Sequence, residues 1–274
     1  MSWGNLMQLS PFDVLTTYLP DYNANNSTLS HQPAGDLNYG AVGFTTDGRR
    51  FRLCSLPSTG TTLAACKLIQ GPAQTAGFHL GTVSTNAAGD GSVNSSSGVN
   101  FVTFTFAGAA TETVVANYFA GGFLSVVTGT GSPQQVQISG NPAITASTTI
   151  QLTLQDPLVL ATVNTATAEL YANAYGNPIV TPGSGNGFTA QPIGVPQIGV
   201  TVSTNAGQNT WFWAQDQGLA TCLAQGATAI GLGGVASQSA AGAIAVEAAT
   251  TAQIAVAMEA GADGLYTVWD LQVG

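Results

Sequence analysis

The sequence predicts an all-β protein, with short antiparallel strands in β-sandwich or barrel domains. Charged residues make up only 6% of the 274-residue chain and Gly contributes 34 residues, a composition typical of many short strands and turns. Apolar and polar residues alternate in segments such as VNFVTFTF and TTIQLTLQ, as in strands with one buried face. Turn-forming stretches such as GTGSP and SGNPA follow such segments at intervals of about 8 to 12 residues.

An extended N-terminal arm is expected over residues 1–40. The stretch YLPDYNANNSTLSHQPAGD is rich in Pro, Asn and Ser and has neither helical nor strand periodicity. A segment of this kind cannot form a core of its own, but a few aromatic residues can anchor it on a partner. Tyr18 and Tyr22 are therefore candidate interface residues.

A first β-sandwich or barrel domain is predicted over residues 41–175. It opens with AVGFTTDGRRFRLC, in which Asp47-Gly48 indicates a two-residue hairpin turn. On the second strand of this hairpin, Arg50 and Arg52 face away from the apolar side chains between them. Further strands are expected at VNFVTFTF, FLSVV, QQVQIS and TTIQLTLQ.

A linker is predicted over residues 176–196, because the segment NAYGNPIVTPGSGNGFTAQPIGVPQ contains four prolines and five glycines. A C-terminal β-domain follows over residues 197–274. Within it, AVEAATTAQIAVAME has the composition of a helix but alternates as a strand does, and we favour the strand. The final strand, GLYTVWDLQV, places Leu265, Thr267, Trp269, Leu271 and Val273 on one face.

The densest aromatic patch is TWFWAQDQGLATC, with Trp211, Phe212 and Trp213 in succession. In a chain of small side chains, two indoles supply much of the apolar area, which favours packing in a core or an interface. The alternative is a carbohydrate platform, on which Trp211 and Trp213 would stack sugar rings from one face of a strand. Trp269 is assigned to the same aromatic packing or interface role.

The charge distribution argues against nucleic acid or an anionic membrane as a partner. The formal net charge is −9, whereas both partners attract chains with excess Lys and Arg. The four cations are Arg49, Arg50, Arg52 and Lys67. We expect them either to dock on acidic residues of a partner, where Arg forms bidentate contacts, or to keep an edge strand soluble.

No pattern of catalytic residues is found, and we expect neither an enzyme nor a bound cofactor. The two histidines, His31 and His79, stand in no Ser or Cys hydrolase motif. The run NAAGDGSVN around Asp90 spaces oxygen ligands as calcium loops do but lacks the closing bidentate acid. We therefore favour an ordinary loop there and predict no metal site.

The cysteines favour a protein that stays in a reducing compartment, and the hydropathy argues against a membrane span. Cys54, Cys66 and Cys222 form no CxxC pair, and an odd number suits free thiols. The N-terminus has no basic segment followed by an apolar one, so we do not expect classical secretion. The uncharged segments contain too much Gly, Ser, Thr and Gln to suit a membrane span.

Several blocks of the chain, from about residue 40 onward, together resemble a group of tailed-bacteriophage virion proteins, the head decoration or cement proteins. The blocks are DGRRFRLC, TTLAACKLIQGPA, ANYFAGGFLSVVTGTGSPQQVQISGN, IQLTLQDPL, NTWFWAQDQGLATCLAQG and YTVWDLQV. The resemblance implies an all-β protein without catalytic residues that sits on the outer face of the capsid. The low charge and the long N-terminal arm depart from that pattern.

The resemblance leads us to expect a protein that binds the major capsid protein, stabilises the head and is assembled in the host cytoplasm. Tyr18, Tyr22 and the four cations would then lie at a capsid or subunit interface. A chain of exposed strand edges and few charges favours association with itself, as a homotrimer or another cyclic oligomer. The alternative function is that of a receptor- or glycan-binding head fibre or spike module.

Overall fold

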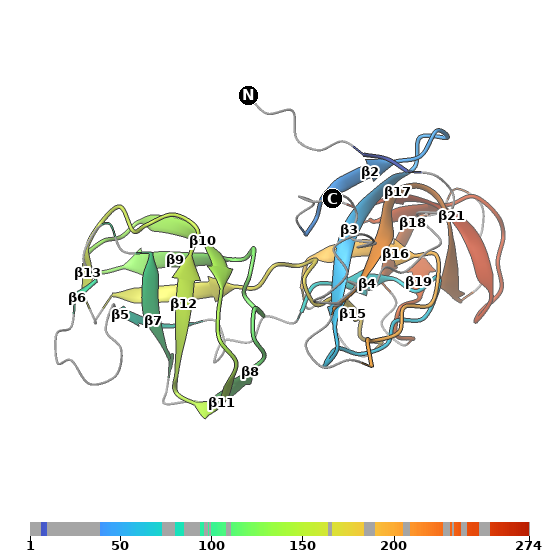
Figure 1. Ribbon diagram of the computed structural model, residues 1–274. Helices are drawn as coiled ribbons and strands as arrows, with labels where there is room; N and C mark the ends of the chain where they lie inside the picture. Colours follow the sequence, from blue (N-terminus) through green and yellow to red (C-terminus); the bar gives the residue numbers. More distant parts are fainter. Residues whose placement is uncertain are drawn as a thin grey trace, which may run out of the picture. The chain divides into compact units, whose positions relative to one another are not determined.

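The computed structural model contains two compact all-β units (Figure 1). It describes residues 7–9, 39–72, 80–84, 94–95, 98, 100–107, 111–163, 166–183, 190–204, 209–226, 231, 233–236, 240–246 and 253–273. No α-helix occurs in these residues, which confirms the predicted all-β class. One unit, here named the sheet unit, comprises Met1–Pro72 and Asn177–Gly274, and the other, the barrel unit, comprises Ala73–Gly176.

The barrel unit is built around a closed barrel in which every neighbouring pair of strands is antiparallel. Closure leaves no strand edge unpaired. In order around the barrel, the strands are β10 (Gln134–Gly140), β12 (Thr149–Leu154), β7 (Phe101–Phe106), β5 (Leu80–Ser84), β14 (Thr167–Tyr171) and β9 (Phe123–Thr128). Two small sheets accompany it, one of β8 (Glu112–Val114) with β11 (Ile144–Ser147) and one of β6 (Asn94–Ser95) with β13 (Thr162–Val163).

Alternation along the strands fills the barrel, as the sequence predicts. The inward side chains of β7 and β12 are Val102, Phe104, Phe106, Ile150, Leu152 and Leu154, and all are buried. The rings of Phe104 and Phe106 meet edge to face with centroids 5.5 Å apart. Gly81 on β5 makes room for Phe104, because an added Cβ would stand 2.5 Å from that ring.

The sheet unit holds a single sheet of 11 strands, of which β17 is the longest. The main path runs β1 (Met7–Gln8), β2 (Val42–Phe44), β3 (Arg50–Pro57), β17 (Asn209–Gln225), β19 (Ile244–Val246), β18 (Gly233–Ala236), β20 (Ala255–Ala257) and β21 (Tyr266–Gln272). The strands β4 (Ile69–Gln70), β15 (Ile179–Val180) and β16 (Pro192–Pro196) join it, with β16 paired to β17. The strand β17 pairs with β3 along its first half and with β21 along its second half, so it joins the first hairpin to the C-terminal strands.

The structure divides the chain at places other than the predicted boundaries of 1–40, 41–175, 176–196 and 197–274. The strand β3 pairs with β17 from Asn209 opposite Pro57 to Gln217 opposite Arg50, so the first hairpin belongs with the C-terminal strands. The expected linker contains β15 and β16, and its Pro192 and Pro196 stand at the two ends of β16, where a missing N–H is tolerated. Residues 7–9 of the expected arm also take part, since β1 pairs with β2 and Leu9 is buried.

The barrel unit is therefore an insertion into the sheet unit. The chain leaves the sheet unit after β4 and returns at β15, and these two strands are partners, with Gln70 opposite Ile179. The Thr181 N–H also donates to the Leu68 carbonyl at 3.1 Å. Both ends of the insertion are thus held by the sheet unit itself.

We predict that each unit folds without the other. Replacing residues 73–176 by a short Gly/Ser linker should leave the sheet unit folded, because a linker need only join two adjacent strands, and the excised barrel should keep its own core. Circular dichroism and amide NMR dispersion of the two products measure this. An excised barrel without a cooperative thermal transition would contradict the prediction.

The first hairpin differs in its turn from the two-residue prediction. The Thr45 N–H donates to the Arg49 carbonyl and the Gly48 N–H to the Thr45 carbonyl, both at 3.0 Å, and Gly48 has φ of 86°. This is a three-residue loop, a type I turn followed by a left-handed residue that Gly adopts without strain. The predicted faces are confirmed, since Phe51 and Leu53 are fully buried and the alternating Arg50 and Arg52 are not.

The C-terminal strands follow the predicted alternation with one exception. Thr267, Trp269, Leu271 and Val273 are buried, but Leu265, assigned to the same face, is 59% exposed because it precedes β21. In the described part of the ambiguous segment AVEAATTAQIAVAME, the favoured strand is confirmed as the end of β19 and the whole of β20.

Candidate functional site

The cations form one cluster of arginines, with Lys67 elsewhere. Arg49, Arg50 and Arg52 all belong to the β2–β3 hairpin. Lys67 is half-buried beside Gly242, where an added Cβ would stand 2.7 Å from the lysine Cβ. The sequence window that groups the four cations therefore does not bring all of them to one place.

Arg50 and Arg52 converge on a single buried carboxylate, that of Asp216. The Arg50 Nε lies 2.9 Å from Asp216 Oδ1 and 3.0 Å from Oδ2, and the Arg52 Nε lies 2.9 Å from Oδ2. The Asp216 side chain is 3% exposed, against 20% and 25% for the two arginines. Asp216 is the extra residue of a β-bulge, because Gln215 and Gln217 face the consecutive residues of β3.

Each arginine also binds a carbonyl from a distant part of the chain. Arg50 Nη2 donates to the Val273 carbonyl at 3.1 Å, and Arg52 Nη1 donates to the Gly40 carbonyl at 3.2 Å. The cluster thus ties β17 to the entry of the first hairpin and to the end of β21. We name Arg50, Arg52 and Asp216 the arginine clamp.

The clamp changes the interpretation of the two arginines. Both predicted roles, docking on a partner's acids and solubilising an edge strand, assumed that the arginines lack a partner within the chain. A buried carboxylate must be paired, because desolvation of an isolated charge is costly. Asp216 is such a carboxylate, and Arg50 and Arg52 are the cations that pair with it. The primary contact of both arginines is therefore internal.

Sequence reasoning missed Asp216, although its setting was informative. The residue stands in a strand, WFWAQDQGLA, whose neighbours are aromatic or small. An acid in such a strand requires a cation, and the chain contains only four. The bulge that turns the carboxylate toward β3 left no recognisable pattern in the sequence.

Arg49 stabilises the tip of the hairpin. Its Nε lies 2.9 Å from Asp47 Oδ2, and its guanidinium lies 5.7 Å from the centroid of the Phe51 ring. The hydrogen bond from the Thr45 hydroxyl, followed by that from Arg49, lowers the pKa of Asp47 to about 2. This pair is open to water, unlike the clamp.

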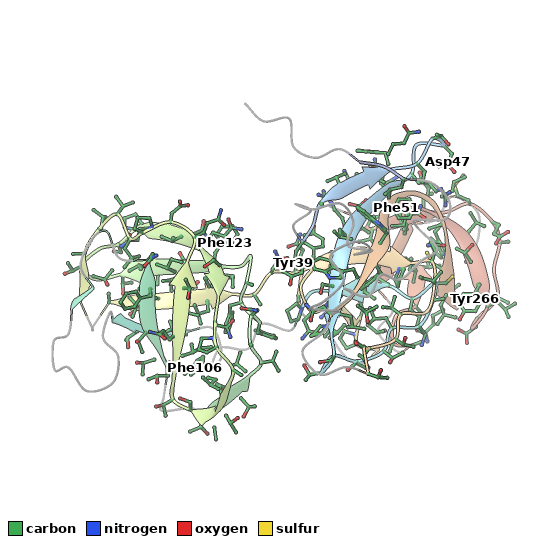
Figure 2. The ribbon with its side chains drawn as sticks, viewed as in Figure 1. Tyr39, Asp47, Phe51, Phe106, Phe123 and Tyr266 are labelled. Carbon is green, nitrogen blue, oxygen red and sulfur yellow. The ribbon has the colours of Figure 1, made fainter. Side chains whose placement is uncertain are left out.

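The aromatic triplet lies mostly in the interior. Phe212 and Trp213 are 0% and 1% exposed, and Trp213 packs with Leu9, Phe51 and Leu53. Trp211 is half-buried and stacks on Tyr39, with centroids 5.0 Å apart and planes 12° apart. Figure 2 shows Tyr39 and Phe51 in this unit.

The carbohydrate platform predicted as an alternative is therefore wrong for this pair of indoles. A platform needs both rings in solvent, and Trp213 is covered by the core residues that surround it. Trp269 is likewise fully buried, and its Nε1 donates to the Thr267 hydroxyl at 2.7 Å. These residues serve packing.

The cysteines are free thiols. Cys54 and Cys222 are buried, and desolvation raises the pKa of both thiols well above the ordinary value. Cys66 is half-buried, and burial raises its pKa as well. A raised pKa leaves little thiolate, which makes the thiols poor nucleophiles.

Several predicted residues lie outside the described residues, namely Tyr18, Tyr22, His31, His79 and Asp90. Within the described part of the chain, no group of three or more His, Cys, Asp or Glu side chains could hold a metal ion. The same part contains no helix long and apolar enough to cross a membrane.

The outside of the barrel carries an apolar surface that the sequence did not suggest. Leu80 on β5, Tyr171 on β14 and Phe123 on β9 are 39%, 40% and 41% exposed. Tyr171 lies directly opposite Phe123, and Leu80 lies opposite Glu169, whose carboxylate accepts a hydrogen bond from the Tyr171 hydroxyl. We name Leu80, Phe123 and Tyr171 the barrel face, of which Phe123 is labelled in Figure 2.

The barrel unit has an acidic composition, and this determines which charges lie near the barrel face. Between Ala73 and Gly176 the sequence contains no Lys or Arg. Glu169 is the acid beside the face, and its hydrogen bond raises the pKa of the Tyr171 hydroxyl. The face therefore offers rings, an aliphatic side chain and one carboxylate to whatever binds it.

Fold and sites together define an all-β protein with an inserted closed barrel, an internal arginine clamp and an apolar surface on the barrel. Comparisons with known protein families, with curated proteins and with solved structures find no match to this chain.

Proposed function

We propose that the chain is a virion structural protein of the head-decoration type, which binds the outer capsid surface through the major capsid protein and stabilises the head. The barrel face is the single observation that carries the proposal. Leu80, Tyr171 and Phe123 lie on three adjacent strands, and exposed apolar side chains gathered on neighbouring strands of a closed barrel favour a binding site.

The composition supports a structural role. A decoration protein must hold its place through many contacts, and each Lys, Glu or Arg side chain immobilised at a contact loses rotamer entropy. With 6% charged residues, the chain offers mostly short Thr, Ser, Ala and Gly side chains instead. The assignment to the capsid itself rests on the resemblance of the sequence blocks described above.

The test is binding to heads assembled without this protein. Phe123→Lys should reduce the number of copies that co-sediment with heads at least about tenfold, because a charge would be buried in the contact. Val159→Lys is the matched control, since Val159 is in the same unit, is 76% exposed and lies outside the barrel face. Binding of Phe123→Lys at the wild-type level would refute the barrel face as the contact, and wild-type protein that fails to bind heads would refute the function.

A further inference from the structure

The strands β17, β20 and β21 carry apolar side chains on their outer face as well as on their inner one. Their inner side chains, including Cys222, Ala255 and Trp269, belong to one buried core. Their outward positions mix polar residues, such as Gln217, Thr221, Asp270 and Gln272, with an apolar group that includes Met258, directly after β20. We name this apolar group the outer sheet face: Leu219, Leu223, Val256, Met258, Tyr266 and Val268.

The strand register makes this face continuous. Asp270 of β21 lies between Leu219 of β17 and Val256 of β20, and Leu223 lies opposite Tyr266. Leu219, Tyr266 and Met258 are 53%, 54% and 47% exposed. Figure 2 shows Tyr266 pointing outward from its strand.

Such a pattern is unusual for a sheet with one face in water. An antiparallel sheet of that kind alternates apolar residues inside with polar residues outside, whereas here only Thr221 and Asp270 interrupt the central apolar rows. A group of outward apolar side chains on neighbouring strands is typical of a surface that another molecule covers.

Opposite charges lie at the two ends of the face. Gln217 pairs with Arg50 on β3 and with Gln272 on β21, which places the arginine clamp at one end. Two guanidinium groups share the one carboxylate of Asp216, so the clamp keeps a net positive charge. At the other end are the exposed acids Glu259, which accepts from the Val268 N–H, and Asp263, which accepts from the Gly226 N–H.

We propose that a second copy of this chain covers the outer sheet face, with the two faces packed against each other about a two-fold axis. In an antiparallel arrangement, the clamp of one copy meets Glu259 and Asp263 of the other, and the apolar residues meet between these ends, with the half-buried Asp270 of each copy among them. Contacts about a two-fold axis use the same patch on both subunits, so the patch must be complementary to itself.

The charge distribution favours this occupant over contacts between other surfaces. The chain has a net charge of −9, and the barrel unit holds no Lys or Arg. Two copies that meet through most of their surfaces would bring acids together, which costs affinity. The outer sheet face offers both signs of charge. A dimer is one of the cyclic oligomers expected from the sequence, and it does not depend on the proposed capsid function.

The experiment measures the mass of the purified protein by light scattering and sedimentation, without heads. The wild type should be a dimer that dissociates more readily as salt rises. The variant with both Leu219→Glu and Met258→Glu should raise the dissociation constant at least about 100-fold, because it buries like charges at the contact. Both residues are about half exposed, so the thermal transition should remain cooperative.

Phe123→Lys in the barrel face is the matched control and should leave the dimer intact. The same control separates this inference from the proposed function, because it is the variant expected to lose head binding. A wild-type monomer at about 100 µM, well above the concentrations at which stable dimers form, would overturn the proposal. So would a trimer, or a double variant that dimerises as the wild type does.

Discussion

Replacing Asp216 by Asn is expected to lower the free energy of unfolding of the sheet unit by about 3 to 5 kcal/mol, the cost of removing one partner from a buried ion pair. The carboxylate is 3% exposed and pairs with two guanidinium groups at once. The amide that replaces it carries no charge, which leaves Arg50 and Arg52 to repel each other. Urea or thermal unfolding of the variant measures the loss.

Asp47→Asn is the matched control. It also removes a carboxylate that pairs with an arginine of the same hairpin, but that pair is exposed to solvent, with the Asp47 side chain 56% accessible. Exposed pairs contribute little to stability, so the unfolding transition should hardly move. Equal shifts for Asp216→Asn and Asp47→Asn would show that the clamp does not hold the unit together.

The clamp also affects how a charge-reversal variant of its two arginines can be interpreted in a head-binding experiment. Replacing Arg50 and Arg52 together by Glu would place three carboxylates where the structure has one between two cations. We expect that variant to unfold the sheet unit, so a loss of head binding would not identify a contact with the shell. Surface variants such as Phe123→Lys avoid this problem.

Local patterns in the sequence predicted much of the fold. Alternation identified the inward residues of β7, β12 and β21, because the side chains of a strand point alternately to its two faces. The Asp47-Gly48 pair located the first hairpin, although the loop is one residue longer than predicted. The exception, Leu265, stands where the strand has not yet begun.

Non-local pairing could not be predicted in the same way. The partner of β3 is β17, which lies beyond the whole barrel unit in the sequence. Turn-rich composition at residues 176–196 indicated a linker, but main-chain hydrogen bonds to β4 and β17 make strands of it. The clamp, the barrel face and the outer sheet face all depend on such pairings, so none could be derived from one segment at a time.

A substitution in the aromatic triplet, Trp211 to Trp213, is also expected to lower the stability of the sheet unit strongly. Trp213→Ala is expected to lower the free energy of unfolding of the sheet unit by about 3 to 5 kcal/mol, the range for truncating a large buried aromatic side chain. Trp213 is 1% exposed. It packs with Leu9, which follows β1, and with Phe51 and Leu53 of β3. Removing the indole leaves a cavity bordered by Phe51 and Leu53 of β3.

Trp211→Ala is the comparison that decides between packing and ligand binding for this strand. Trp211 is half-buried and stacks on Tyr39 at 5.0 Å, so its loss should cost less, about 1 kcal/mol for the stacked pair plus part of its apolar area. Chemical unfolding of both variants should therefore rank Trp213→Ala well below Trp211→Ala in stability. Two results together would contradict the core role: equal free energies of unfolding for the two variants, and binding of the wild type to a glycan array that either variant loses. They would indicate that these indoles bind a ligand. Packing predicts the opposite result, because a side chain enclosed by Phe51 and Leu53 stabilises the sheet unit but cannot reach a ligand.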